Sequence, residues 1–338
     1  MLLSETKRLI ESLIDNGTVS NIAIRVGKYN DIIGEVYSEG VSDTTLFDMA
    51  SVTKILSVTM ISLISLERKI ISLQDKVSKL FDVPDHYKDL TVYNLLTHTM
   101  GIGYKNLTGG EYGSDRVVEQ ILSIYDFPPS EDVRYSCPAF ILMGKVLEKL
   151  YNKKLDVLFD EMIATPLGMK TSGYCPDIKG YTNIVSSNAE PEKARIVNDY
   201  NCQHLGGVAG NAGIFSCISD LTLFTQTMLD NGNPLVTKDI MDLAAQNHTE
   251  KMSAARGLGF LYVDSRYDQT GNLFPCGSIG HCGHTGTSVF WNRESGLYVI
   301  ILSDATVSGI RKYGDEKYDI VMKMRKDIHN AVKADLGK

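Results

Sequence analysis

Phe47-Asp-Met-Ala-Ser-Val-Thr-Lys54 opens a long, mostly apolar segment, residues 51–68, that ends in basic residues. Apolar runs that end in cations are typical of buried helices. Residues three apart on a helix share one face, at about 5–6 Å between Cβ atoms, so Lys54 can reach the Ser51 hydroxyl. A buried lysine held neutral can accept the serine proton, and the helix N-terminus offers backbone N–H groups to an oxyanion. Alone, the pattern also fits an N-cap serine followed by a solvated lysine.

Composition restricts the class of protein. The 338 residues include 34 Lys and Arg against 41 Asp and Glu, a net charge of −7 that excludes the basic profile of a nucleic-acid binder. We therefore expect small molecules or proteins as partners, and we leave the oligomeric state open. Six cysteines are scattered without a CxxC pair, as in reduced cytosolic proteins, and residues 1–17 lack the apolar core of a signal peptide, so we expect a cytoplasmic location. The cysteines are Cys137, Cys175, Cys202, Cys217, Cys276 and Cys282.

The order of predicted elements indicates an α/β chain with an insertion. We expect a discontinuous sheet domain, residues 1–75 and 196–338, a helical insertion, residues 76–195, and an active site between them. The longest apolar stretch, residues 55–66, falls short of the roughly 20 residues of a membrane span and fits a buried helix. The ranges behind this division are a helix over 1–17, strands over 21–27 and 32–38, helices over 92–98, 117–125 and 139–149, strands over 257–263, 287–291 and 297–302, and a helix over 317–332.

Further segments follow the first motif in a fixed order. They are Leu95-Leu-Thr-His-Thr-Met-Gly-Ile102, Tyr135-Ser-Cys137, Pro166-Leu-Gly-Met169, Leu205-Gly-Gly-Val-Ala-Gly-Asn-Ala-Gly-Ile-Phe-Ser216 and Gly280-His-Cys-Gly-His-Thr-Gly-Thr-Ser288. Together with residues 47–54 they resemble the serine β-lactamase and penicillin-binding protein superfamily, most of all its class C β-lactamase-related, esterase-like branch. The resemblance covers about residues 20–305 and implies a β-lactamase/transpeptidase-like fold, an antiparallel sheet flanked by helices with an inserted helical subdomain.

The resemblance also implies roles for individual residues. Ser51 corresponds to the acylated nucleophile, Lys54 to its proton partner and Tyr135 to the general base, whose phenolate needs nearby cations such as Lys54 or His281. The oxyanion hole corresponds to the backbone N–H groups of Ser51 and His284. Substrate contacts are implied at Cys137, His281, Cys282 and Gly283.

Three of these positions depart from the pattern of the lactamases. His281 stands where they carry lysine, Cys282 where they carry a hydroxyl residue, and Cys137 where Tyr-x-Asn carries its amide. Each change weakens recognition of a penicillin-like ligand, because neutral histidine and thiols replace a permanent charge, a hydroxyl and an amide. We therefore expect the acyl-transfer residues to be retained and efficient β-lactam hydrolysis to be lost. The Lys-Thr-Gly motif of the lactamases corresponds to His281-Cys282-Gly283 when the segment 280–288 is aligned without a gap. An alternative register places this motif at His284-Thr285-Gly286.

Two functions fit the sequence. The leading one is a serine hydrolase without metal or cofactor, an esterase or amidase/peptidase that acts on a small or peptide-like ester or amide through an acyl-enzyme. The alternative is a catalytically weak, penicillin-binding-protein-like binding or sensing protein for cell-wall-like peptides. A zinc site of His281, Cys282 and His284 is disfavoured, because positions 281 and 284 of a strand face opposite sides. We interpret His98 as a buried, hydrogen-bonded structural histidine, and the glycines of residues 205–216 as tight turns.

Overall fold

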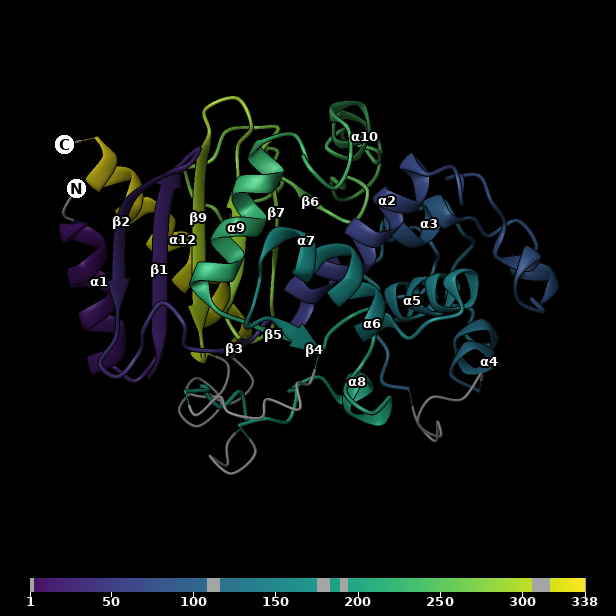
Figure 1. The fold of residues 1–338 in the computed structure, drawn as a ribbon, viewed down its shortest axis with the longest axis horizontal. Helices are drawn as coiled ribbons and strands as arrows, with labels where there is room; N and C mark the ends of the chain where they lie inside the picture. Colours follow the sequence, from purple (N-terminus) through teal and green to yellow (C-terminus); the bar gives the residue numbers. More distant parts are fainter. Residues whose placement is uncertain (1–2, 108–115, 175–182, 189–193, 306–316, 338) are drawn as a thin grey trace.

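The computed structural model describes residues 3–107, 116–174, 183–188, 194–305 and 317–337. Its centre is a six-stranded antiparallel sheet in the order β2-β1-β9-β8-β7-β6 (Figure 1). The strands are β1 (Ile22–Lys28), β2 (Asp31–Tyr37), β6 (Leu261–Tyr262), β7 (Ile279–Cys282), β8 (Ser288–Trp291) and β9 (Leu297–Ser303). The predicted β1–β2 hairpin and the strands β8 and β9 are confirmed.

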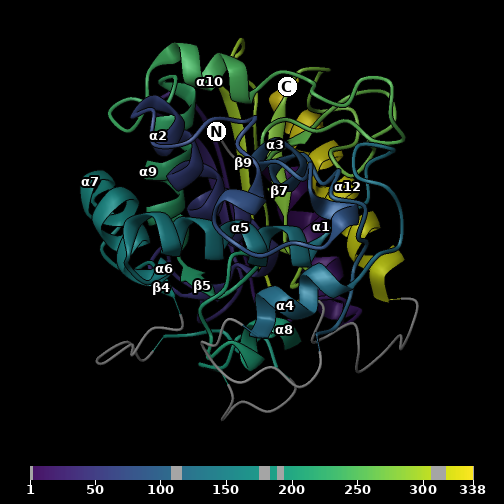
Figure 2. The ribbon, with the colours of Figure 1, turned by 90° about the vertical axis from the view of Figure 1, so that its right-hand side faces the viewer.

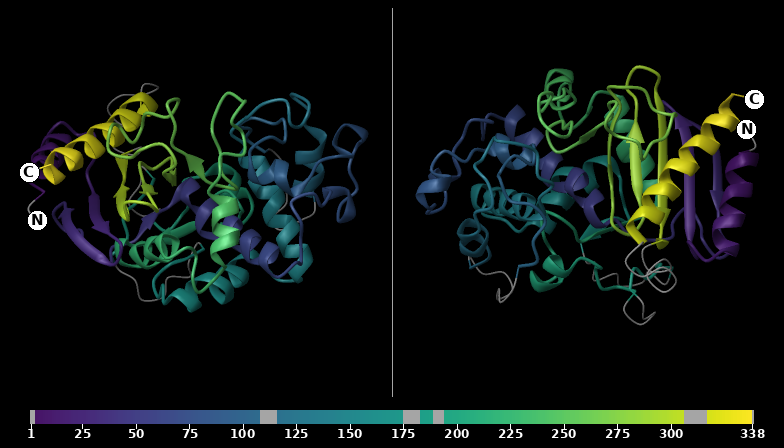
Figure 3. Two further views of the ribbon diagram at one scale, coloured as in Figure 1. Left: turned by 90° about the horizontal axis from the view of Figure 1, so that it is seen from above. Right: turned by 180° about the vertical axis from the view of Figure 1, so that it is seen from behind.

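Helices cover both faces of this sheet. Helices α1 (Ser4–Asp15) and α12 (Lys317–Leu336) lie together on one face, and α9 (Ile218–Leu229) lies on the other (Figures 1 and 3). The Asp335 carboxylate accepts hydrogen bonds from the backbone N–H groups of Glu5 and Thr6, both at 2.9 Å, which ties the two ends of the chain together. The predicted N-terminal and C-terminal helices are therefore confirmed.

The remaining helices gather at one end of the sheet, in front of strands β7 and β9 in Figure 2. They are α2 (Met60–Glu67), α3 (Val92–Leu96), α4 (Arg116–Ser123), α5 (Cys137–Tyr151), α6 (Leu155–Phe159), α7 (Thr165–Leu167), α8 (Tyr200–His204) and α10 (Lys238–Ala244). A small second sheet, ordered β3-β5-β4, joins β3 (Phe47–Asp48), β5 (Ile214–Ser216) and β4 (Gly173–Tyr174). Five cysteines are free thiols, and Cys175 lies outside the described residues.

The long apolar segment is helical from end to end but changes its winding. A 3₁₀ turn over Ala50–Val52 is followed by a π-helical turn over Ile55–Thr59 and then by α2. By length and composition the run Ala50–Glu67 could cross a membrane, and 83% of it is buried inside the protein, as in the core helix that the sequence predicts. π-Turns are rare and concentrate at functional sites, and this one directly follows the Ser51–Lys54 motif.

One predicted strand is largely wrong. Only Leu261 and Tyr262 of the range 257–263 belong to a strand. Gly259 has φ +80°, and a Cβ on it would lie 1.9 Å from the Thr59 hydroxyl, so the backbone here turns and packs directly on the core helix. The division into a sheet domain and a helical insertion stays a prediction; one hydrophobic cluster includes Ala23 of β1 and Phe140 of α5.

Candidate active site

Three side chains, from the segments 47–54 and 135–137, meet at the start of the core helix. The Tyr135 hydroxyl donates to Ser51 Oγ at 2.7 Å, and Lys54 Nζ donates to Ser51 Oγ and to the Tyr135 oxygen, both at 2.9 Å. Ser51 and Lys54 come from the helix start, and Tyr135 comes from the residues just before α5. The structure therefore brings a hydroxyl, an amine and a phenol within direct hydrogen-bonding distance of one another.

Lys54 is completely buried beneath this site, and all of its donors are used. The backbone carbonyl of Asn211 accepts a third hydrogen bond from Nζ at 3.1 Å. An ammonium has three N–H donors, and here the three oxygens of Ser51, Tyr135 and Asn211 receive them. The Cys137 thiol lies 3.6 Å from Nζ. The surroundings of Lys54 are thus those of a charged ammonium.

Electrostatics agree with that protonation state. Burial lowers the pKa of Lys54, but the Cys137 and Tyr135 groups raise it by more, so its pKa lies above the ordinary value. Burial raises the pKa of Tyr135, and Lys54 offsets only part of that rise. Burial alone favours the neutral lysine that the sequence suggested, but three oxygen acceptors surround Nζ and its pKa is raised, so we assign the ammonium. At rest the site holds an ammonium and a neutral phenol.

The turn that presents Ser51 is held in an unusual backbone conformation. Ala50, directly before Ser51, has φ +44°, a value that alanine rarely adopts. The buried Asp48 carboxylate supports it by accepting the Ala50 N–H at 2.8 Å, the Asn198 N–H at 2.7 Å and the Ser187 hydroxyl at 2.9 Å. Strained backbone that is supported in this way is common at functional sites.

Tyr135 is positioned by the LLTHTMG segment. The buried ring of His98 contacts the rings of Tyr135 and Phe140 in tilted arrangements, with centroid distances of 4.9 and 4.8 Å, and its Nδ1 accepts the Ser136 N–H at 3.0 Å. Burial holds the pKa of His98 well below its usual range, so the ring is a neutral acceptor. The prediction of a buried, hydrogen-bonded structural histidine is confirmed.

The glycine-rich segment approaches the site more closely than any side chain would allow. A Cβ on Gly210 would lie 1.9 Å from the Phe140 carbonyl oxygen, and Gly213, at φ +123°, would clash with the Gly207 carbonyl oxygen at 2.4 Å. Glycine is therefore required at these two positions, because the backbone there lies too close to its neighbours for a Cβ atom. These close contacts also bring the Asn211 carbonyl onto Lys54.

Strand β7 and the turn after it form the opposite wall. His281 is buried, its Nδ1 lies 2.8 Å from the Cys282 carbonyl oxygen, and burial and then Lys54 hold its pKa well below the usual range. His281 is therefore neutral and cannot serve as a cation for a Tyr135 phenolate. Gly283 lies against the nucleophile turn, since a Cβ on it would be 2.6 Å from the Met49 carbonyl oxygen.

The turn over residues 283–287 is fixed from two sides. Thr285 donates to the Asp48 carbonyl at 2.9 Å, which links the turn to the nucleophile segment. The buried Arg325 of α12 donates to the carbonyl oxygens of Gly283, Gly286 and Thr287. This clamp holds the turn that carries His284. The Thr285 hydroxyl donates to the Asp48 carbonyl and is therefore not available to a substrate. The geometry thus favours the register at His281 over the register at His284-Thr285-Gly286.

A cavity of about 730 Å³ opens over Ser51. Every predicted site residue except Lys54 lines it: Ser51, Tyr135, Cys137, His281, Cys282, Gly283 and His284. The expectation that His281 and His284 face opposite sides is wrong, because β7 ends at Cys282 and His284 lies in the turn. Within the described ranges, no group of three or more His, Cys, Asp or Glu side chains is placed to hold a metal ion.

Sequence reasoning missed several residues of this site. Asn211 acts through a backbone carbonyl, which its side-chain type does not reveal. Asp48 could have been found, because it lies in the segment 47–54, three residues before Ser51. A carboxylate at that position can accept the backbone N–H groups of the turn that presents the serine. Arg256 and Arg325 line the cavity from segments outside every motif, and no pattern in the sequence pointed to them.

The fold and this constellation define a serine acyl-transferring type of site, and comparison with known proteins gives the family. The Beta-lactamase family model matches residues 6–320, and the chain belongs to this family. A relative from Escherichia coli O157:H7, named as a D-alanyl-D-alanine carboxypeptidase, is 26% identical over 64% of this chain and 57% of its own length. Esterase EstB from Burkholderia gladioli is 24% identical over 79% of each chain.

Solved structures share the fold. A penicillin-binding protein homologue from Caulobacter crescentus superposes with a TM-score of 0.75 over 97% of both chains, at 13% identity. The predicted β-lactamase/transpeptidase-like architecture, an antiparallel sheet flanked by helices, is confirmed. The chain is thus a member of a serine-hydrolase family with relatives that are named as a carboxypeptidase and as an esterase.

Proposed function

We propose that this protein is a serine hydrolase of the class C β-lactamase-related, esterase-like branch that works through an acyl-enzyme on Ser51. The observation that carries the proposal is the closed set of hydrogen bonds among Ser51, Lys54 and Tyr135, at 2.7 to 2.9 Å. A neutral serine hydroxyl needs a base within hydrogen-bonding distance to become a nucleophile, and the phenolate of Tyr135 is that base.

The proton inventory defines the reactive form. At rest Lys54 is an ammonium and Tyr135 a phenol, so the site must first lose one proton. The Lys54 ammonium, 2.9 Å from the Tyr135 oxygen, stabilises the resulting phenolate. Tyr135 then takes the Ser51 proton as Oγ attacks the acyl carbon, and the N–H groups of Ser51 and His284 receive the oxyanion.

Collapse of the tetrahedral intermediate releases the leaving group, which takes its proton from the Tyr135 hydroxyl. Tyr135, again a phenolate, then removes a proton from water, and the resulting hydroxide attacks the acyl carbon. Ser51 leaves with the proton held by Tyr135, and the cycle closes without a metal or cofactor.

Substrates are proposed to be esters or amides of small or peptide-like acids, with weak or no β-lactam hydrolysis. The Cys137 thiol replaces a hydrogen-bonding amide and lies against Lys54, and the Cys282 thiol lies 3.2 Å from the Tyr267 hydroxyl. Neither offers the strong donor that would orient a β-lactam. Turnover of a penicillin at the rate of the ester would contradict this part of the proposal.

The test is turnover of 4-nitrophenyl butyrate, together with a fluorophosphonate label, by the wild type and by Ser51→Ala. Ser253→Ala is the matched control, because it removes another hydroxyl of the cavity wall that lies outside the hydrogen-bonded trio. We expect turnover and labelling to be lost only in Ser51→Ala. A wild type that neither turns over nor labels would favour the binding or sensing alternative.

A further inference from the structure

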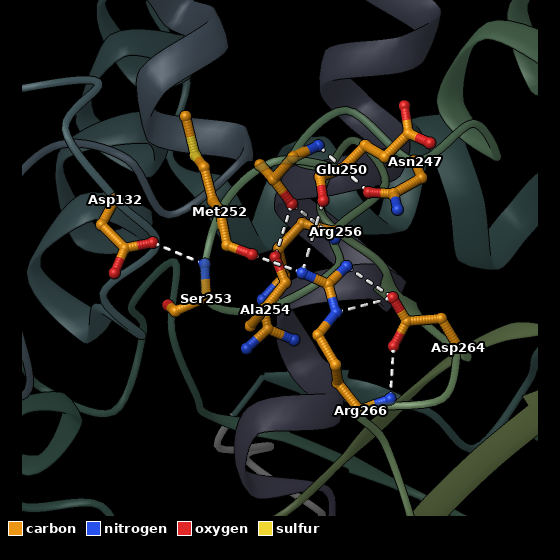
Figure 4. Close-up of polar contacts among 10 residues, drawn as sticks. Asp132, Asn247, Glu250, Met252, Ser253, Ala254, Arg256, Asp264 and Arg266 are labelled. Carbon is orange, nitrogen blue, oxygen red and sulfur yellow. Dashed lines mark hydrogen bonds and ion pairs between the residues drawn. The ribbon is translucent and has the colours of Figure 1, made fainter.

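Arg256 presents a guanidinium to the cavity without a partner (Figure 4). Its backbone is bonded, N–H to Thr249 Oγ1 at 2.9 Å and carbonyl to the His248 N–H at 2.8 Å. Its buried Nε has no hydrogen-bond acceptor. Across the part of the chain that the structure describes, no side-chain hydrogen bond or ion pair of Arg256 occurs. The side chain as a whole is half-buried, so its terminal N–H groups can meet a ligand in the cavity. An anionic ligand there would also supply the acceptor that Nε lacks.

The loop that carries Arg256 is anchored on both sides (Figure 4). Asp132, from the segment between α4 and α5, accepts the Ser253 N–H at 2.7 Å. Arg266 donates to the carbonyl oxygen of Met252 and pairs with the Asp264 carboxylate, with Nε 2.8 Å from the nearer oxygen. The loop therefore holds Arg256 at the cavity wall, while the cation beside it, Arg266, is already neutralised.

The anionic side chains of the cavity wall are also engaged. Asp264 pairs with Arg266, and Asp199 accepts the Cys202 N–H at 2.8 Å and the Asn211 amide at 2.9 Å. Burial lowers the pKa of Arg256, and the phenol of Tyr135 offsets part of this. A guanidinium stays protonated under such shifts. In a chain of net charge −7, the cavity thus displays an uncompensated positive charge.

The wall formed by β7 cannot take over that role. His281 is neutral, and position 282 offers a thiol that already lies against Tyr267. Arg256, by contrast, has a planar fork of N–H donors that matches the two oxygens of a carboxylate.

We propose that Arg256 is the anion subsite of this cavity and selects ester or amide substrates that carry a carboxylate. The proposal rests on the proposed hydrolase function and names the substrate class of the same site. Carboxylate recognition is then supplied by the 247–256 loop instead of by strand β7.

The test compares two esters that differ in one carboxylate, mono-4-nitrophenyl glutarate and 4-nitrophenyl butyrate. We expect Arg256→Met to lower the ratio of their kcat/KM values by at least about tenfold, since charged hydrogen bonds contribute this much or more. Arg256→Lys keeps the positive charge but loses the planar fork of N–H donors, so its ratio should lie between those of the wild type and Arg256→Met. Arg8→Met, at an exposed and remote arginine, removes the same net charge and should change the ratio by less than about twofold.

A binding measurement separates this proposal from the hydrolase function. Glutaric acid mono-4-nitroanilide is titrated calorimetrically into Ser51→Ala, with and without Arg256→Met, and the second change should raise Kd by at least about tenfold. Arg256-dependent binding without any ester turnover in the wild type would overturn the hydrolase function and support the anion subsite. An unchanged ratio and an unchanged Kd would overturn the subsite. Equal losses on both esters with an unchanged Kd would also overturn it, because Arg256 would then act on Tyr135.

The variant is suited to this test, because the hydrogen bonds that Arg256 makes to the described residues all involve its backbone. Replacing the side chain leaves them in place and removes one buried N–H, that of Nε, which has no acceptor. We therefore expect Arg256→Met to melt no lower than the wild type.

Discussion

Replacing Tyr135 by phenylalanine removes one oxygen from the centre of the site and little else. The ring keeps its contacts with His98, at a centroid distance of 4.9 Å, and with the Lys54 ammonium, 5.0 Å from the ring centroid. What is lost is the acceptor for the Ser51 proton and one of three oxygen acceptors of Lys54. The change therefore tests the base, with the surrounding packing conserved.

The size of the effect follows from these contacts. A positioned general base contributes about 10²- to 10⁴-fold, so kcat/KM for 4-nitrophenyl butyrate should fall by that factor. Leaving Lys54 with one unsatisfied donor costs about 1–3 kcal/mol of unfolding free energy. The nearby Cys137 thiol, 3.6 Å away, offers only a weak replacement. We expect a folded protein with a modestly lower Tm.

The assay is initial-rate kinetics with circular dichroism and thermal melting on the same samples. Tyr87→Phe is the matched control, since it removes a buried hydroxyl that donates to the Ile124 carbonyl at 2.7 Å, away from the cavity. Tyr87→Phe should lose a comparable amount of unfolding free energy but keep the kcat/KM of the wild type. A folded Tyr135→Phe that retains more than about a tenth of the activity would remove Tyr135 as the base.

Three further predictions concern charge and positioning. Because the pKa values of Lys54 and Tyr135 are both raised, kcat/KM should increase about tenfold per pH unit between pH 6 and 8; a plateau already at pH 7 would contradict the assigned resting state. Arg325→Met should lower kcat by at least about tenfold with little change in KM, because the loosened turn weakens oxyanion binding; a folded variant of unchanged kcat would refute the clamp. Burial lowers the pKa of His329 to about 4, so the unfolded chain binds this proton first as the pH falls below about 6.5, and stability is lost there. His329→Gln should therefore lose about 2 kcal/mol less unfolding free energy than the wild type between pH 7 and 5 in urea titrations; equal losses would show that this ring does not titrate as described.

Much of the fold and the central trio could be predicted because short-range patterns encode them. The alternation of residues 21–38 specifies a hairpin, and the spacing of Ser51 and Lys54 places both on one helical face. Tyr135 could be assigned only through the ordered family motifs, since nothing local places it on Ser51.

The rest depends on contacts between distant segments. The charge of Lys54 depends on the Asn211 carbonyl, 157 residues away, and a carbonyl is common to every residue type. Likewise, the strand expected over 257–263 is mostly absent, because Gly259 packs on Thr59 of the core helix. The unpaired state of the Arg256 side chain also depends on which distant segments surround it, and no local pattern encodes that.

The central claim is that Ser51 carries the acyl group between two chemical steps. The most direct measurement is peptide-resolved mass spectrometry of enzyme quenched in acid during steady-state turnover of saturating 4-nitrophenyl butyrate. The account predicts a butyryl group on the peptide that contains Ser51 and none in Ser51→Ala. Turnover with a butyryl group on another residue, or with Ser51→Ala fully active, would contradict it.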